Sequence, residues 1–159
     1  MMERHVDDAR RMDDRPRDTA YVEYWLRRAG MTLLSLPDRG PILGWRPQSE
    51  ELRRSLAEQA AERRLLRRTP SAVDISAMDV ALGWLRLVPD DRRVLRRIVA
   101  ARMLVSPTTE RHLYSWRQIA RLVGADHHAV QRWHAQGINH IVRGLKALED
   151  ATPGMRRAA

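Results

Sequence analysis

Apolar side chains recur every three or four residues along most of this 159-residue chain. That spacing is typical of helices that bury one face, and no stretch alternates apolar and polar residues between turns as a half-buried strand does. We therefore expect an all-α fold, a compact domain of about six helices. The expected helices cover residues 19–36, 49–67, 70–88, 90–105, 115–123 and 126–148.

Prolines and capping residues set the expected helix ends. Asp18 or Thr19 can cap the first helix, and Pro37 stops it. Thr69, directly before Pro70, is the expected start of the third helix, because proline suits a first helical turn. That helix carries two adjacent apolar stripes, so we expect it to lie at the centre of the fold. One stripe contains Val73, Ala77, Val80 and Trp84, and the other contains Met78, Ala81, Leu82, Leu85 and Val88.

The helices are expected to fall into two segments between polar tails. Residues 19–69 form a helical pair, either an interaction module or a brace for the core, and residues 70–150 form the second domain. Residues 1–18 are polar and of mixed charge, and we expect them and residues 151–159 to be disordered tails.

The charge of the chain indicates a polyanion as partner. The formal net charge is +9, and 28 of the 29 basic residues are arginine. Such an excess favours nucleic acid, although GC-rich coding could also produce many arginines. Residues 115–145 hold four arginines and a single acid, Asp126. Codon bias alone would not remove acids from this stretch, so we interpret it as the contact region.

Several kinds of site are excluded or disfavoured. The chain has no cysteine, which rules out disulfides, thiolate catalysis and cysteine-based zinc sites. His127 and His128 are adjacent and diverge by about 100° on a helix, and His134 and His140 are six residues apart, so neither pair suits a metal. There is no nucleophile, base and acid constellation and no glycine-rich phosphate loop. We expect no catalysis, no metal and no cofactor.

The chain also lacks the signals of a membrane or exported protein. No apolar run approaches the roughly 20 residues that span a bilayer, and the first residues contain no apolar leader. We expect a cytoplasmic, nucleoid-associated protein with no membrane partner.

The stretch "SWRQIARLVGADHHAVQRW", residues 115–133, predicts two helices joined by a tight turn. Ser115 and Gln118 have the spacing of a capping box, and Gly124 can take the left-handed conformation that ends a helix. Asp126 can cap the next helix, whose buried face is expected at Val130 and Trp133. This spacing is typical of a helix-turn-helix whose second helix enters the major groove, whereas an αα-hairpin used only for packing is the alternative.

The second helix of this motif then presents its polar side chains outward. Gln131 can pair with adenine, Arg132 can pair with guanine or a phosphate, and the imidazoles can donate to either kind of group. The residues that we expect to contact DNA are His127, His128, Gln131, Arg132, Ser115, Arg117 and Arg121.

The segment "IARLVGADHHAVQRWHAQGINHI" resembles the promoter-recognition domain, region four, of bacterial primary sigma factors. The preceding "LVPDDRRVLRRIVAARML" resembles the helix that leads into that domain, so the likeness covers residues 87–145 with an inserted loop at 105–114. It implies base contacts for His127, His128, Gln131 and Arg132, and contact with RNA polymerase.

A wider pattern includes "YVEYWLRRAGMTLLSLP" and "TPSAVDISAMDVALGWLRLVPDDRRVL". It resembles a family of small, largely uncharacterised alphaproteobacterial phage and prophage proteins. The arrangement is also similar to that of phage late-gene antitermination proteins, which act on RNA polymerase.

Three functions remain open from the sequence. The first is a phage-type transcription regulator that binds duplex DNA and contacts RNA polymerase. The second is an antitermination-type factor that chiefly binds the polymerase, and the third is a small terminase-like protein for packaging viral DNA. The apolar stripe Gly137, Ile138, Ile141, Leu145 and Leu148 is either a homodimer seam or a cover for the first helix of the same chain.

Overall fold

The computed structural model describes residues 16–36, 54, 58 and 69–152, and within these ranges it is helical with no strand. The expected all-α class is therefore confirmed for these residues, whereas the expected count of about six helices is not. The helix expected over 49–67 and most of both expected tails lie outside the described residues. The described helices are α2 (Thr19–Ser35), α4 (Ala72–Gly83), α5 (Arg93–Met103), α6 (Trp116–Val123) and α7 (His127–Ala151), with short 3-10 turns at Trp84–Leu87 and Asp90–Arg92.

Helix α2 begins where the sequence predicts. The carboxylate of Asp18 accepts a hydrogen bond from the amide of Tyr21 at 2.8 Å, and the helix ends just before Pro37. At Gly30 it passes very close to the end of α5, because a Cβ atom there would lie 2.0 Å from the carbonyl oxygen of Met103. Glycine is thus required at this crossing of α2 and α5.

Helix α4 begins later than expected and is not central. Ser71, rather than Thr69, is the N-cap, and it forms a reciprocal capping box with Asp74. The stripe with Met78 and Ala81 is buried against α2, whereas the other stripe is buried only at Trp84, whose ring stacks on Tyr21. The side chains of Val73 and Val80 are 43% and 52% exposed, so the expectation of a central helix is wrong.

The start of α5 is held by an arginine that the helical pattern does not reveal. Arg96 donates to the carbonyl oxygen of Val88 at 2.6 Å and to the carboxylate of Asp90 at 2.9 Å, which fixes the 3-10 turn before the helix. Val94 has the helical spacing of the buried residues of α5 but is 44% exposed. The helix ends at Met103, and the loop that follows contains an isolated antiparallel bridge between Val105 and His112.

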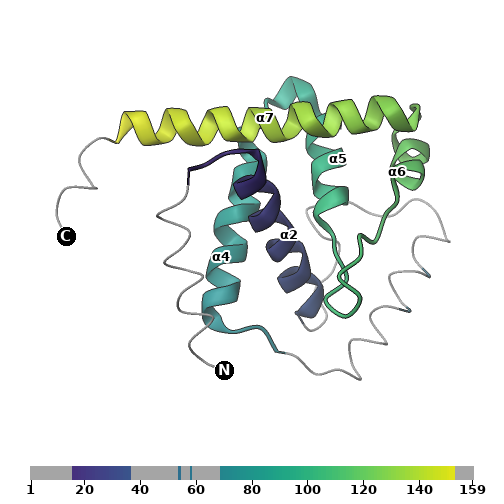
Figure 1. Cartoon of the computed structure of the whole chain (residues 1–159), viewed down its shortest axis with the longest axis horizontal. Coiled ribbons are helices and arrows are strands. Elements are labelled where there is room, and N and C mark those ends of the chain that lie inside the picture. The colour runs from purple at the N-terminus through teal and green to yellow at the C-terminus, as the bar shows by residue number, and fades with distance from the viewer. Residues whose placement is uncertain (1–15, 37–53, 55–57, 59–68, 153–159) are drawn as a thin grey trace.

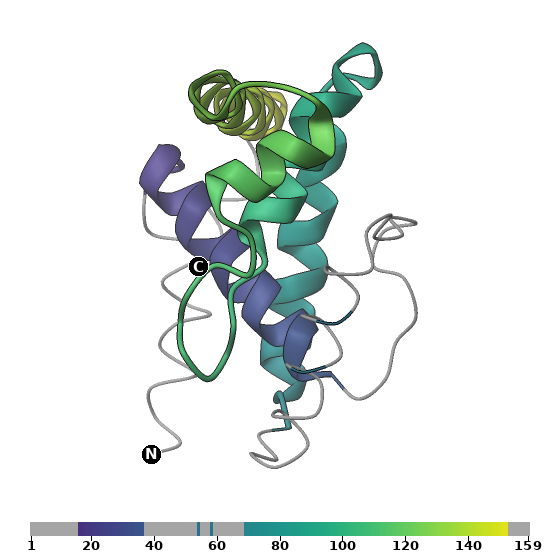
Figure 2. The same cartoon turned by 90° about the vertical axis from the view of Figure 1, so that its right-hand side faces the viewer.

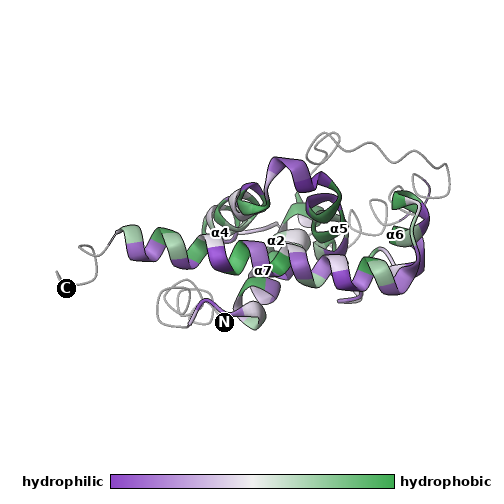
Figure 3. Cartoon of the chain, turned by 90° about the horizontal axis from the view of Figure 1, so that it is seen from above, coloured by the Kyte–Doolittle hydropathy of each residue, from purple (hydrophilic) through white to green (hydrophobic). Residues whose placement is uncertain are grey.

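Helix α7 is a single rod of 25 residues that crosses α2, α5 and the 3-10 turn at Trp84–Leu87 (Figure 1). Seen from above, it lies across the other helices along most of its length (Figure 3). A Cβ atom at Gly137 would lie 2.6 Å from Val99 Cγ2, and one at Gly144 would lie 3.0 Å from Leu87 Cβ. Both glycines therefore permit close approach of other elements to α7.

The apolar stripe of α7 is covered by the same chain. Gly137, Ile138, Ile141 and Leu145 are buried, and the last three belong to one continuous core with residues of α2, α4, α5 and α6. This confirms the intrachain interpretation of the stripe over a dimer seam, except at Leu148, which is 55% exposed. In the part of the chain that the structure describes, no helix has the length and apolar character needed to cross a bilayer.

Candidate nucleic-acid interface

Helix α6 and the turn after it are fixed by the capping interactions that the sequence predicts. The amide of Ser115 donates to Gln118 Oε1 at 2.8 Å, and the amide of Gln118 donates to Ser115 Oγ at 3.2 Å. Gly124 is left-handed, with φ of 68°, and the amide of Ala125 returns to the carbonyl oxygen of Ala120 at 3.0 Å. The chain therefore reverses within three residues before α7 begins.

Asp126 starts α7 and orders its first turn. Its carboxylate accepts from the amides of His128 at 2.8 Å and Ala129 at 3.4 Å. The hydrogen bond from His128 is the main cause that lowers the pKa of the Asp126 carboxyl. The other carboxylate oxygen lies 3.3 Å from His127 Nδ1. The acid in this stretch is thus engaged in capping, and it also positions the neighbouring imidazole.

Three of the four α7 side chains expected to contact DNA are exposed, and the fourth, His127, is half-buried. His128, Gln131 and Arg132 are exposed, whereas Val130 beneath them is completely buried. Trp133 is half-buried against the core. The rings of His127 and His128 lie with their centroids 4.0 Å apart. The first two turns of α7 therefore offer two imidazoles, a carboxamide and a guanidinium to a partner.

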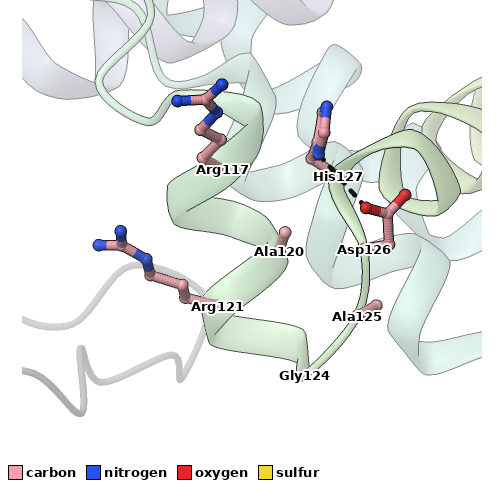
Figure 4. Close-up of a pocket in the computed structure, with 7 residues that line it drawn as sticks. All are labelled: Arg117, Ala120, Arg121, Gly124, Ala125, Asp126 and His127. Carbon is pink, nitrogen blue, oxygen red and sulfur yellow. Dashed lines mark ion pairs between the residues drawn. The ribbon is translucent and has the colours of Figure 1, made fainter.

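A hollow of about 460 Å³ lies between α6 and the start of α7. All four of Arg117, Arg121, Asp126 and His127 line it, and Figure 4 shows the two arginines projecting from α6 on the side away from Asp126 and His127. Neither arginine has an acidic partner within the described ranges. Seen from the end at which α7 begins, α6 stands in front of the core (Figure 2). This end of the molecule is hence accessible and basic.

The seven expected residues are not all gathered in that hollow. Arg117, Arg121 and His127 line it, whereas His128, Gln131 and Arg132 lie on the exposed face of α7 beside it. Ser115 stands apart, because its hydroxyl belongs to the capping box at the other end of α6. Its contribution to the interface is therefore to fix the start of α6.

A cluster formed by Arg102, Trp116 and His134, which we call the joint, was not predicted from the sequence. The guanidinium of Arg102 lies 4.1 Å from the ring centroid of Trp116 and donates to the carbonyl oxygen of Tyr114 at 2.8 Å. The ring of His134 meets the same indole edge-on, with centroids 5.2 Å apart. Trp116 thereby links α6 to α5 and α7. These three residues are far apart in the chain, so no local spacing could reveal the joint.

Several arginine and histidine side chains lie close together at the joint. Burial lowers the pKa of His134 to about 4, and the charge of Arg102 and then of His112 adds to the effect. His112, whose Nδ1 is 2.7 Å from the carbonyl oxygen of Arg102, also has a lowered pKa, caused first by burial and then by Arg102. Burial and the neighbouring Arg27 lower the pKa of Arg102. The packed form of His134 is therefore neutral.

Acid should loosen this joint. Because the pKa of His134 is about 4 in the folded chain, well below the ordinary histidine value of 6.5, the unfolded chain takes up the proton first as pH falls. The free energy of unfolding should be unaffected above pH 6.5 and should lose about 2–3 kcal/mol between pH 6.5 and 4 from this group. Urea unfolding across that range measures it. His134→Gln should show a smaller loss, and an equal loss in both proteins would contradict this role.

Neither a protein-family model, nor a curated protein, nor a solved structure matches this chain. Among the described residues, no group of three or more histidine, aspartate or glutamate side chains could hold a metal ion.

Proposed function

We propose that this protein binds duplex DNA through α6 and α7, used as a helix-turn-helix, and regulates transcription. The observation that carries the proposal is the pairing of a buried Val130 with an exposed row of His128, Gln131 and Arg132 on α7. Imidazole, carboxamide and guanidinium groups are those that hydrogen-bond base edges in the major groove. A helix used only for packing also turns polar side chains to solvent, but from His127 to Leu148 this helix has no acidic side chain among them, which favours a polyanion as partner.

The basic groups of α6 supply the second half of the interface. Arg117 and Arg121 lie beside the first turn of α7, and phosphate contacts from such residues set the register of a reading helix on DNA. The joint of Arg102, Trp116 and His134 holds α6 at a fixed angle to α7. A fixed angle is needed because both helices must meet one duplex at the same time.

Contact with RNA polymerase is the further part of the proposal, and it rests on the resemblance to sigma region four. The site of contact is open, and affinity capture with purified polymerase would test it. Size-exclusion chromatography of the 18.5 kDa chain distinguishes the proposed regulator from the packaging alternative. The regulator is expected to elute as a monomer or dimer, whereas a terminase-like ring would elute at many times this mass.

The test of DNA binding itself is a salt titration with a mixed-sequence duplex. A protein making about four to six phosphate contacts gives a log–log slope of affinity against salt near −4 to −5. Absence of binding at low salt, or a slope near zero, would contradict the proposed function.

A further inference from the structure

The exposed face of α7 continues far beyond the residues expected to read bases, and the inference drawn from it rests on the proposed function. Residues spaced by three and four along α7 share one face of the helix. We call this set the polar face. It consists of His128, Arg132, Ala135, Asn139, Arg143 and Lys146, all of them exposed.

The polar face carries no negative charge from His128 to Lys146. From His127 to Leu148 the sequence contains no aspartate or glutamate, although 31% of the whole chain is charged. The first acids after it are Glu149, which pairs with Arg17 at 2.7 Å, and Asp150, which is exposed and follows Lys146 by four residues on the same face. Neither Arg143 nor Lys146 has an acidic partner in the described ranges, and the guanidinium of Arg143 only donates to the carbonyl oxygen of Asn139, at 3.4 Å. A solvated face in this chain would be expected to mix both signs of charge.

Helix α7 is packed against the core from Val130 as far as Leu145. Val99 of α5 approaches Gly137, and Leu87 approaches Gly144, so two neighbouring elements hold the helix along its length. Ile138, Ile141 and Leu145 are buried on the side opposite the polar face. The two distal cations are therefore held at a set distance and direction from Arg132.

The distance of Arg143 and Lys146 from Arg132 can be compared with the depth of the major groove. At a rise of 1.5 Å per residue, Arg143 lies about 16 Å and Lys146 about 21 Å beyond Arg132 along the axis. The groove is about 8.5 Å deep, so a rod whose first turns touch its floor and that is tilted by about 25° rises about 7–9 Å over this distance. The two cations then reach the level of the phosphates, whereas Ala135 and Asn139 pass over the groove.

We infer that Arg143 and Lys146 bind phosphates of the DNA strand that borders the groove entered by the first turns of α7. The ligand of this extension is the duplex backbone, so its contribution is independent of sequence. The footprint of the protein is longer than that of a two-turn reading helix, and α7 both reads bases and anchors on the backbone.

The test compares two charge-matched double variants of the full chain. Arg143→Gln with Lys146→Gln removes two positive charges from the polar face. Arg93→Gln with Arg97→Gln removes two from the exposed face of α5, where neither arginine has a described acidic partner. Both are titrated with salt against one labelled, mixed-sequence duplex of about 20 base pairs, which is about 70 Å long at 3.4 Å per pair. Unchanged urea unfolding confirms that each variant folds.

The α7 variant should lose about two units of salt slope and should bind roughly 10- to 60-fold more weakly at 0.1 M salt. The α5 variant should retain the slope of the wild type. Equal losses in both variants would show an effect of net charge alone and would overturn the inference. Normal duplex binding by the α7 variant would also overturn it, and would leave the proposed function intact.

Lys146 offers an independent readout because it is the only lysine in the sequence. Acetylation with an amine-reactive reagent, followed by peptide mass spectrometry, reports its accessibility alone. The duplex should slow the modification of Lys146 at least severalfold at low salt, and high salt should restore the rate. A duplex that binds without protecting Lys146 contradicts the inference, whereas a wild-type chain that binds no duplex overturns the proposed function as well.

Discussion

Replacing Gln131 and Arg132 together by alanine will abolish most of the preference of this protein for its best duplex site. Each bidentate pair with a base is worth about 1–3 kcal/mol, so the double variant should lose at least about 30-fold in affinity for a site selected from a random pool. Both side chains are exposed, and the free energy of unfolding should change by less than about 0.5 kcal/mol. Fluorescence anisotropy with the selected and a scrambled duplex measures the effect.

The control for this variant is Arg117→Gln with Arg121→Gln, which removes charge from the other helix of the interface. Because these arginines are expected to touch phosphates, their loss should weaken the selected and scrambled duplexes by the same factor. If the α7 variant also weakens both duplexes equally, Gln131 and Arg132 are backbone contacts and base reading must lie elsewhere.

Substitution of alanine for Gly30 should cost at least about 3 kcal/mol of the free energy of unfolding. The added Cβ would lie 2.0 Å from the carbonyl oxygen of Met103 and 2.8 Å from its carbon, and a backbone group at the end of α5 cannot move aside as a flexible side chain can. The helices α2 and α5 would have to separate, which would open the core. Urea unfolding of the purified variant provides the measurement.

Gly83→Ala is the matched control, since no atom lies within 4 Å of the Cβ position there. Alanine in this helical position should be neutral or stabilising by up to about 1 kcal/mol. A Gly30→Ala protein as stable as the wild type would show that α2 does not cross α5 as closely as described.

Much of the candidate interface follows from local sequence. The caps at Ser115 and Asp126, the left-handed Gly124 and the outward direction of Arg132 all depend on residues within about one turn of one another. Local hydrogen-bonding preference and helical spacing are sufficient to predict such features. For the same reason, the cap of α2 at Asp18 and its end before Pro37 were predictable.

Features that depend on which helices pack against each other were not predictable from the sequence. The two stripes of α4 look alike in the sequence, yet α2 covers the one with Met78 while Val80 stays exposed, because only one face of α4 meets a partner among the described helices. Val94 likewise fits a helical spacing but faces solvent. The contact of Arg102 with Trp116 joins residues from different helices, and spacing carries no information about it.

The same distinction applies to the glycines of α7. The sequence marks Gly137 and Gly144 only as weak points of a helix, with either a kink or a close approach to follow. The structure assigns both to close approach, to Val99 and Leu87 respectively. The choice between a kink and a close approach depends on the residue that packs against each glycine. Val99 and Leu87 are distant from these glycines in the sequence, so helical spacing does not reveal them.

The most direct test of base reading by α7 is to remove the major-groove acceptor N7 from single purines of the selected site. Arginine and glutamine contact this atom when they read guanine or adenine. With 7-deazapurines placed one at a time, at least one position should weaken wild-type binding about tenfold, and the same position should have no effect on the variant that lacks Gln131 and Arg132. If every 7-deaza substitution leaves wild-type affinity unchanged, these side chains do not read purines in the major groove, and the central claim is contradicted.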